Sequence, residues 1–421
     1  MKIEKVLGRE ILDSRGLPTV ECNLFLSGGV KVTASVPSGM STGKYEALEL
    51  RDNDLSWYQG KGVKTAVKNL ETKIADLIIG REPNLIKMDK SIIDYDGTIN
   101  KSNLGANAVL AASITIARAQ ALNEGKQLYS FLSSFCVNGK SSIPSCMFNL
   151  LNGGVHASNG ICFQEFMVMP KIGNSFVVSL QKIAVIYQNL KKLLLKKGFS
   201  VGVGDEGGFA PLIKDSNLYP EEVALNLLME AIEISGFSGD MVICLDVAAS
   251  QFYDKFLGKY ILYGKAFSAE DLVDFYEKLI LKYSIFSIED GMDEDDWNGW
   301  AILTSRLGSK IQIVGDDIFV TNCEKIKKGL ALGVANTVLI KPNQIGTVSE
   351  AIETINYCKK INYKTVISHR SGETCDTFIA DLVVAMEAKQ FKCGAPVRGE
   401  RVVKYNRLLE LSFDLNCVNK L

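Results

Sequence analysis

The chain has 421 residues, of which 47% are hydrophobic and 23% charged, as in ordinary globular proteins. The 47 lysines and arginines nearly balance the 48 aspartates and glutamates, so the formal net charge of -1 predicts no general attraction to nucleic acid or to an anionic membrane. The N-terminus MKIEKVLGREILDSRG is charged throughout, and no uncharged apolar run is long enough to span a bilayer. We therefore expect neither a signal peptide nor membrane insertion.

The cysteines and histidines indicate the compartment. Ten cysteines are scattered without a C-x-x-C pair, and the chain has only two histidines. This composition disfavours a zinc site and predicts free thiols in a reducing cytoplasm.

The first part of the chain has a mixed pattern. The alternating segments TVECNLFL and VKVTASV are typical of strands, and the Gly28-Gly29 pair between them predicts a turn. The Ala-rich segment 106–125 predicts a helix that ends near its last glycine. The polar segment 137–145 is the predicted linker, so we expect an α+β domain over residues 1–137 and a larger α/β domain over residues 138–421.

The second part repeats one pattern, in which a short apolar run ends in a polar residue and a helical segment follows. The later repeats are about 25 residues apart, which suits successive βα units. An α/β barrel carries its chemistry at the carboxyl ends of its strands. A doubly wound open sheet would also alternate, but it would not direct so many charges to one mouth, so we favour the barrel. The residues that end the runs are Asp246, Glu289, Asp316, Lys341, His369 and Lys392.

Three of these run ends are carboxylates, at Asp246, Glu289 and Asp316. Each alone is compatible with a simple helix cap. Three converging carboxylates would repel one another and need a cation between them. Ligands that are all oxygen predict Mg²⁺ first and Mn²⁺ second.

A lysine and a glutamate suggest acid–base chemistry. Lys341 follows the apolar run TVLI, where burial and a nearby dication would depress its pKa and make it a neutral general base; a structural lysine paired with an acid is the alternative. The segment VGVGDEGGFAP contains G-x-G-x-x-G, but its acids would lie against a pyrophosphate and no helix follows. We expect its glycines to present Glu206 in a tight loop, as an acid facing the lysine.

Two loops are less specific. Residues 36–47, VPSGMSTGKYEA, suit a phosphate cradle or a closing lid. The segment LNGGVHASNGICFQEF carries His156, with Gln164 and Glu165 after it.

The segment VISHRSGETCDTF contains His369, Arg370 and Ser371. His369 and Ser371 would share one face of a regular strand, but a Ser-His hydrolase is disfavoured because no G-x-S-x-G elbow is present. The same strand geometry turns His369 away from Arg370. Arg370 and Ser371 suit a phosphate oxyanion instead.

Taken together, the motifs resemble the enolase family. The resemblance spans nearly the whole chain, through ILDSRGLPTVE, VPSGMSTG, LNGGVHASN, QEFMVMP, GDEGGFAP, LDVAAS, SIEDG, GDDIFVTN, KPNQIGT, SHRSGET and KCGAPVRGERVVKYN. It implies an N-terminal α+β domain and a C-terminal α/β barrel whose first units depart from regular alternation. It also implies the reversible dehydration of 2-phosphoglycerate to phosphoenolpyruvate in glycolysis, by a homodimer or higher oligomer.

The resemblance implies roles for the site residues. Lys341 would remove the C2 proton, and Glu206 would protonate the departing C3 hydroxyl with help from Glu165. A structural Mg²⁺ would lie on Asp246, Glu289 and Asp316, and a second Mg²⁺ would enter with the substrate and use Ser41. The substrate would be bound by Gln164, His156, Lys341, His369, Arg370, Ser371 and Lys392.

The chain departs from the usual family pattern at positions outside the assigned chemistry. The departures are Met40 for Ala, Gln251 for Glu, Cys375 for Glu, Cys393 for Thr and Gly399 for Ser. By the same resemblance, Glu21 and Arg401 would pair across the dimer interface. Two other functions stay open, namely a binding role for a cell-surface or secreted fraction, and proton abstraction from a different acid. SHRSGET and the Gly/Ser loop favour the phosphorylated substrate over the latter.

Overall fold

The N-terminal strands form because apolar side chains alternate along them. The computed structural model describes residues 1–39, 43–157, 159–171, 175–213 and 217–418. A three-stranded antiparallel sheet consists of β1 (Ile3–Leu12), β2 (Pro18–Leu26) and β3 (Val30–Ser35), in that order. Gly28 and Gly29 form the predicted turn with φ of 93° and 80°, values that favour glycine.

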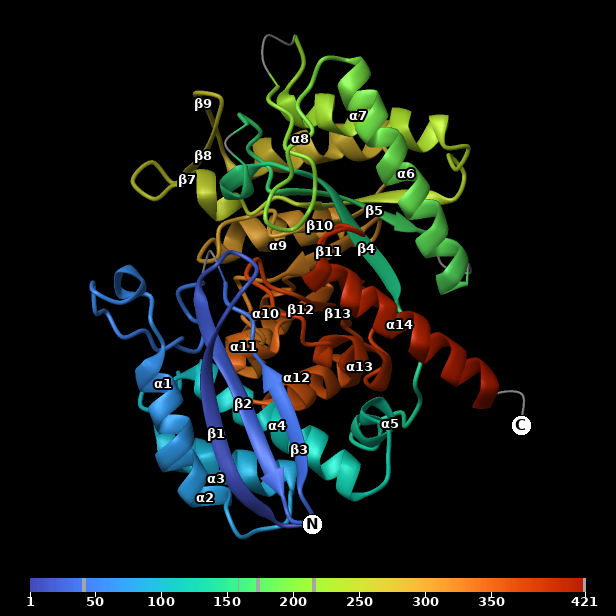
Figure 1. Ribbon diagram of the computed structural model, residues 1–421. Coiled ribbons are helices and arrows are strands. Elements are labelled where there is room, and N and C mark those ends of the chain that lie inside the picture. The colour runs from blue at the N-terminus through green and yellow to red at the C-terminus, as the bar shows by residue number, and fades with distance from the viewer. Residues whose placement is uncertain (40–42, 158, 172–174, 214–216, 419–421) are drawn as a thin grey trace.

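Helix α4 (Ala106–Asn123) is the centre of the N-terminal part, and it is apolar almost all round. It packs on β2 and β3, where alternate residues of β2 such as Val20, Cys22 and Leu24 are fully buried. Figure 1 shows this sheet and its helices at one end of the molecule. The other helices are α1 (Lys64–Asn69), α2 (Ala75–Ile78), α3 (Leu85–Asp96) and α5 (Leu128–Ser133).

The C-terminal part is a closed eight-stranded barrel with strand order β10-β11-β12-β13-β14-β4-β5-β6, so the predicted α/β fold class is confirmed. The strands are β4 (Ser145–Asn152), β5 (Glu165–Pro170), β6 (Met241–Asp246), β10 (Ile285–Glu289), β11 (Gln312–Gly315), β12 (Thr337–Ile340), β13 (Lys364–Ser368) and β14 (Gln390–Lys392).

Strand β5 runs against its neighbours. It pairs antiparallel with both β4 and β6, whereas the other neighbouring strands of the barrel are parallel. Its first residue, Glu165, therefore pairs with Asp246, the last residue of β6. This reversal brings Glu165 to the mouth formed by the carboxyl ends of the parallel strands.

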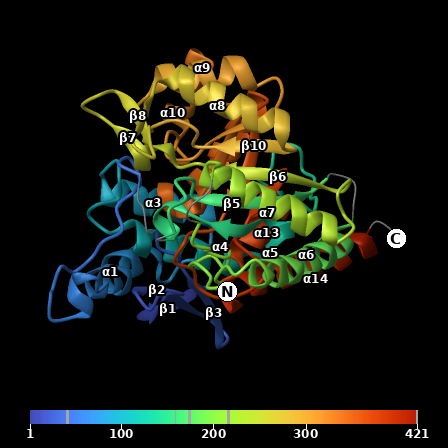
Figure 2. The ribbon, with the colours of Figure 1, turned by 90° about the horizontal axis from the view of Figure 1, so that it is seen from above.

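Helices cover the outside of the barrel. Figure 2 shows the barrel strands between α8 and α9 on one side and α6 and α14 on the other. Helix α8 begins with a capping box of Ser268 and Asp271, and α7 begins with Pro220. The helices are α6 (Phe176–Lys196), α7 (Pro220–Ile234), α8 (Ala269–Lys282), α9 (Trp297–Leu307), α10 (Cys323–Leu332), α11 (Pro342–Ile345), α12 (Val348–Lys360), α13 (Phe378–Ala385) and α14 (Gly399–Val418).

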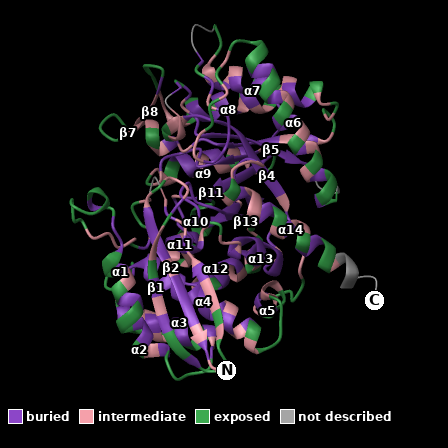
Figure 3. Ribbon diagram, viewed as in Figure 1, coloured by how far each residue is buried: buried purple, intermediate pink, exposed green. Residues whose placement is uncertain are grey.

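Side chains fill the barrel interior, so it is a core and not a channel. A cluster of buried residues from its strands packs there, and Figure 3 shows the barrel strands as buried. The cluster consists of Met147, Met167, Met169, Cys244, Val314, Leu339 and Val366. A small sheet of β7 (Tyr253–Asp254), β8 (Lys259–Leu262) and β9 (Lys265–Phe267) lies outside the barrel sheet. No helix among the described residues is long and apolar enough to cross a membrane.

One expectation from the sequence is wrong. Arg401, in the first turn of α14, was expected at a subunit interface, but its side chain is 0% exposed within the chain itself. Glu21 forms its ion pair with Arg9 of the adjacent strand β1. Arg401 is therefore an interior residue, and it contacts the candidate site described next.

Candidate active site

The strand-end residues meet at one mouth of the barrel. Asp246 and Glu289 end β6 and β10 and are paired in register. Asp316 and Lys341 directly follow β11 and β12, and Lys392 ends β14. Parallel pairing of these strands brings all five residues to the same edge of the barrel.

Lys392 is the centre of the acidic group. Its Nζ atom lies 2.8 Å from Asp246 Oδ2 and 2.9 Å from Glu289 Oε1. It also lies 3.3 Å from Glu165 Oε1. Burial opposes its charge, but the three carboxylates outweigh burial and raise the pKa of Lys392 well above its ordinary value. Burial and the neighbouring Asp246 raise the pKa of Glu289.

Lys341 is hydrogen-bonded to Asp316. Burial acts to lower the pKa of Lys341, but the Asp316 carboxylate outweighs it and the pKa is raised. The acid on the preceding strand thus stabilises the ammonium form, whereas the sequence predicted a depressed pKa from burial together with a neighbouring dication. The alternative of a lysine paired with one of the acids describes the observed contact.

A glycine-rich loop between α6 and α7 presents Glu206, which is 3% exposed. Gly207 has a φ of 87°, and a Cβ atom there would lie 2.9 Å from Val397 Cγ2. The tight loop predicted from the sequence is thus present, and the glycine permits its close packing. Asn149 donates a hydrogen bond of 3.1 Å to Glu206 Oε2, and His369 Nε2 lies 3.4 Å from the same oxygen.

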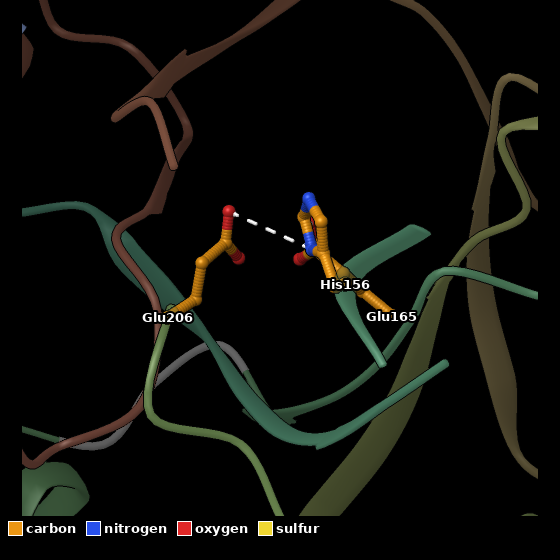
Figure 4. A group of neighbouring side chains, drawn as sticks. All are labelled: His156, Glu165 and Glu206. Carbon is orange, nitrogen blue, oxygen red and sulfur yellow. Dashed lines mark ion pairs between the residues drawn. The ribbon is translucent and has the colours of Figure 1, made fainter. Parts of the chain in front are cut away.

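Glu206 and Glu165 form a carboxyl pair beside His156. His156 Nδ1 lies 3.9 Å from an oxygen of each, and Figure 4 shows His156 and Glu206 pointing toward one another. Burial, followed by the neighbouring Glu206 carboxylate, raises the pKa of Glu165 well above its ordinary value. Two buried carboxylates that share a site favour a proton shared between them.

Gln164 lies between this pair and the strand-end acids. Its Nε2 atom is 3.4 Å from Asp246 Oδ2, and its Oε1 atom accepts a hydrogen bond from Gln251. Gln251 Oε1 in turn accepts from the backbone N–H of Val155, which precedes His156. Gln251, which stands where the family usually has Glu, thus ties Gln164 to the backbone of the segment that carries His156.

Arg370 and Ser371 lie where the two parts of the chain meet. Arg370 donates to both oxygens of Glu46 at 2.7 and 3.2 Å. Arg15 of the N-terminal part donates to Ser371 Oγ at 3.3 Å. Strand β13 ends at Ser368, so regular alternation does not apply to the residues after it, but His369 and Arg370 still contact different partners.

The carboxylates at the mouth suit a hard cation. Among the described residues, two groups hold ligand atoms within 4.8 Å of one another, namely His156 with Glu165 and Glu206, and Asp290 with Asp316 and Asp317. Neither is the predicted trio, and Lys392 Nζ contacts two of its members, Asp246 and Glu289. The trio nevertheless fits Mg²⁺ in chemistry, since its donors are all carboxylate oxygens and the buried Glu289 Oε2 has no hydrogen-bond partner. Ser41 and Met40 lie outside the described residues.

Several residues of the site do not stand out in the sequence. Asn149 lies two residues before the recognised motif LNGGVHASN, and Arg15 lies inside ILDSRGLPTVE, but neither was singled out. Glu46 was passed over within the Gly/Ser loop. Their partners are distant in the chain, so only the fold brings them together. Cys375 is exposed, and nothing in the structure explains its substitution for the usual Glu.

Two family models match the chain. The model described as the C-terminal TIM barrel domain of enolase matches residues 140–419, and the model described as the N-terminal domain of enolase matches residues 3–132.

Proposed function

Because the chain belongs to the enolase family and is thus an enolase-type hydro-lyase, we propose that it catalyses the reversible dehydration of 2-phosphoglycerate to phosphoenolpyruvate in glycolysis. The observation that supports this most is that the strand-end lysines contact the strand-end acids in the buried mouth of the barrel. Lys341 contacts Asp316, and Glu206 belongs to the carboxyl pair. A base and an acid are thus supplied by different segments of one mouth.

Lys341 is the proposed base. Its neutral amine takes the proton from C2 of the substrate, which leaves an aci-carboxylate with a second negative charge. The ion pair with Asp316 favours the ammonium form, so the lysine becomes a base only when that pairing is weakened. After proton transfer the lysine is again an ammonium, which stabilises the intermediate electrostatically.

Glu206 is the proposed acid, with Glu165 beside it. As the C3–O bond breaks, Glu206 gives its proton to the hydroxyl, which departs as water, and the electron pair left by the C2 proton forms the double bond. The Asn149 amide and His369 Nε2 face the resulting carboxylate. In the resting pair Glu165, whose pKa is raised by burial and by Glu206, holds the proton, and Glu206 receives it and passes it to the departing hydroxyl.

The substrate carboxylate belongs near Lys392 and the strand-end acids. The enolase superfamily pairs a lysine or histidine base with one or two Mg²⁺ ions, and the family generally uses Mg²⁺. Mg²⁺ held by Asp246, Glu289 and Asp316 would offset the doubled charge of the aci-carboxylate and compete with Lys341 for Asp316. We assign a second ion to Ser41. Lys392, Gln164 and His156 bind and orient the acid end of the substrate.

Arg370 and Ser371 are the proposed phosphate-binding residues. Arg370 is buried and retains its charge, and Arg15 lies beside Ser371 Oγ. Guanidinium and hydroxyl donors of this kind suit a phosphate oxyanion.

We also propose the division into domains 1–137 and 138–421, and a homodimer or higher oligomer in the cytoplasm. The gap between the two matched ranges supports the division. The cysteines among the described residues are free, which is consistent with a reducing compartment.

The test is direct. Formation of phosphoenolpyruvate from 2-phosphoglycerate is followed by ultraviolet absorbance, with Mg²⁺ and then with excess chelator. We expect turnover that the chelator abolishes and added Mg²⁺ restores. A folded protein without turnover in saturating Mg²⁺ would contradict the proposal.

A further inference from the structure

Arg401 links three segments beneath the site. Its guanidinium donates to the carbonyl oxygens of Arg370 at 2.7 Å, Ser371 at 2.6 Å and Asp205 at 3.3 Å. Asp205 precedes Glu206, so Arg401 fixes both the loop of the proposed acid and the segment of the phosphate-binding residues. A Cβ atom on Gly394 would lie 3.3 Å from Arg401 Cδ, which shows how closely the side chain is packed.

The same guanidinium contacts the ring of His369. Arg401 Nη1 is hydrogen-bonded to His369 Nδ1. An arginine is only a donor and keeps its charge in proteins, so Nδ1 must act as the acceptor. A neutral ring that accepts at Nδ1 carries its proton on Nε2. That nitrogen lies 3.4 Å from Glu206 Oε2, so the N–H faces the proposed acid.

We propose that Arg401 is a positioning residue that holds His369 as the neutral Nε2–H tautomer and thereby directs an N–H toward Glu206. The inference rests on the proposed function for its consequence in catalysis, but the tautomer itself is a property of the protein without substrate. A doubly protonated ring would place an Nδ1–H against the guanidinium, so the ring stays neutral while Arg401 is present.

The charged groups around His369 agree with this assignment. Glu206 from the glycine-rich loop favours protonation of the ring, whereas Arg401 from α14 and Lys392 from β14 oppose it. Burial has the largest effect, and together these lower the pKa of His369 to about 3. The ring should therefore not titrate over the working range.

Imidazole nitrogen NMR on protein labelled with ¹⁵N-histidine tests the tautomer. The chain has only two histidines, so a His156→Asn variant assigns both signals. We expect His369 to show Nε2–H and an unprotonated Nδ1, unchanged from about pH 5 to 9. An Nδ1–H tautomer or a protonated ring in the wild type would overturn the inference.

Two variants of Arg401 extend the test. Arg401→Lys keeps the charge but has no planar fork, and Arg401→Met removes both, so both should release the ring to mix tautomers. Lys404→Met is the control, because Lys404 is a buried cation of the same helix that donates to Thr374 O at 2.8 Å and pairs with Glu373. It should leave the His369 signal unchanged. If Arg401→Met does not fold, the spectra of the wild type and of Arg401→Lys still test the tautomer of His369.

A kinetic readout separates positioning from general damage. At saturating substrate, where weaker phosphate binding does not affect either rate, Arg401→Lys should lower dehydration at least about tenfold while exchange of the C2 proton with solvent stays within about threefold, because the His369 tautomer acts on Glu206. Equal loss of both rates would overturn the positioning role. Absence of turnover in the wild type would refute the proposed function and leave the NMR result standing on its own.

Discussion

The Nζ atom of Lys392 lies 2.8 Å from Asp246 Oδ2, so one of the chain's own cations neutralises the acidic centre of the site. The same nitrogen is 2.9 Å from Glu289 Oε1. Buried carboxylates without a cation are costly, and a side-chain ammonium and a metal ion are two ways to offset that cost. Stability and metal binding should therefore depend on each other at this position.

Lys392→Met should lower the free energy of unfolding in chelator by roughly 3–5 kcal/mol, because it leaves buried carboxylates unpaired. Added Mg²⁺ should recover part of this loss and stabilise the variant more than the wild type. Urea unfolding with and without Mg²⁺ measures both effects. Lys404→Met removes another buried cation, outside this acidic centre, and should gain no more from Mg²⁺ than the wild type. An equal gain from Mg²⁺ in all three proteins would refute the prediction.

Gln251 should affect substrate binding through Gln164. Gln251→Leu removes the hydrogen bond that orients the Gln164 amide, and we expect the KM for 2-phosphoglycerate to rise about fivefold with little change in kcat. Gln251→Glu still accepts from Val155 N–H but bonds to Gln164 only if that amide turns over, which points Gln164 Oε1 at Asp246, so its KM should rise by less than that of the Leu variant. Steady-state kinetics compares the two, and a larger defect in the Glu variant than in the Leu variant would contradict the account.

Asp89 should produce a pH-dependent stability outside the site. It is fully buried in α3, where Ser113 Oγ at 2.8 Å and Ser349 N at 3.0 Å donate to one of its oxygens. Burial raises its pKa to about 6 in the folded protein. The folded state therefore holds an extra proton from about pH 4 to 6, and stability falls as the pH rises through that window by up to roughly 3 kcal/mol.

Asp89→Asn removes this titration. Its amide oxygen can accept both hydrogen bonds, and no charge is buried at high pH. Relative to the wild type, the variant should gain stability from pH 4 to 6 and keep that gain above pH 6. Urea unfolding at several pH values measures the difference, and a difference that does not change with pH would show that Asp89 is not the group responsible.

The sequence predicted the residues that follow from local pattern. Asp246 and Glu289 each end a buried run, and parallel pairing alone brings such residues together. It did not predict the position of Lys392 between them, because that contact depends on barrel closure between β14 and β4. The direction of the pKa shift of Lys341 was missed for a similar reason, since it depends on the distance to Asp316. Arg401 was misplaced because its interface position rested on the family resemblance alone, and its actual partners, Asp205 and Arg370, are distant in the chain.

The division of labour between Lys341 and Glu206 is the central claim. It is tested by exchange of the C2 proton of 2-phosphoglycerate with solvent in Lys341→Ala and Glu206→Gln. We predict that exchange vanishes in Lys341→Ala, and that it survives in Glu206→Gln while dehydration falls by about 10²-fold or more. Equal loss of exchange in both variants, or exchange that persists in Lys341→Ala, would contradict the assignment of base and acid.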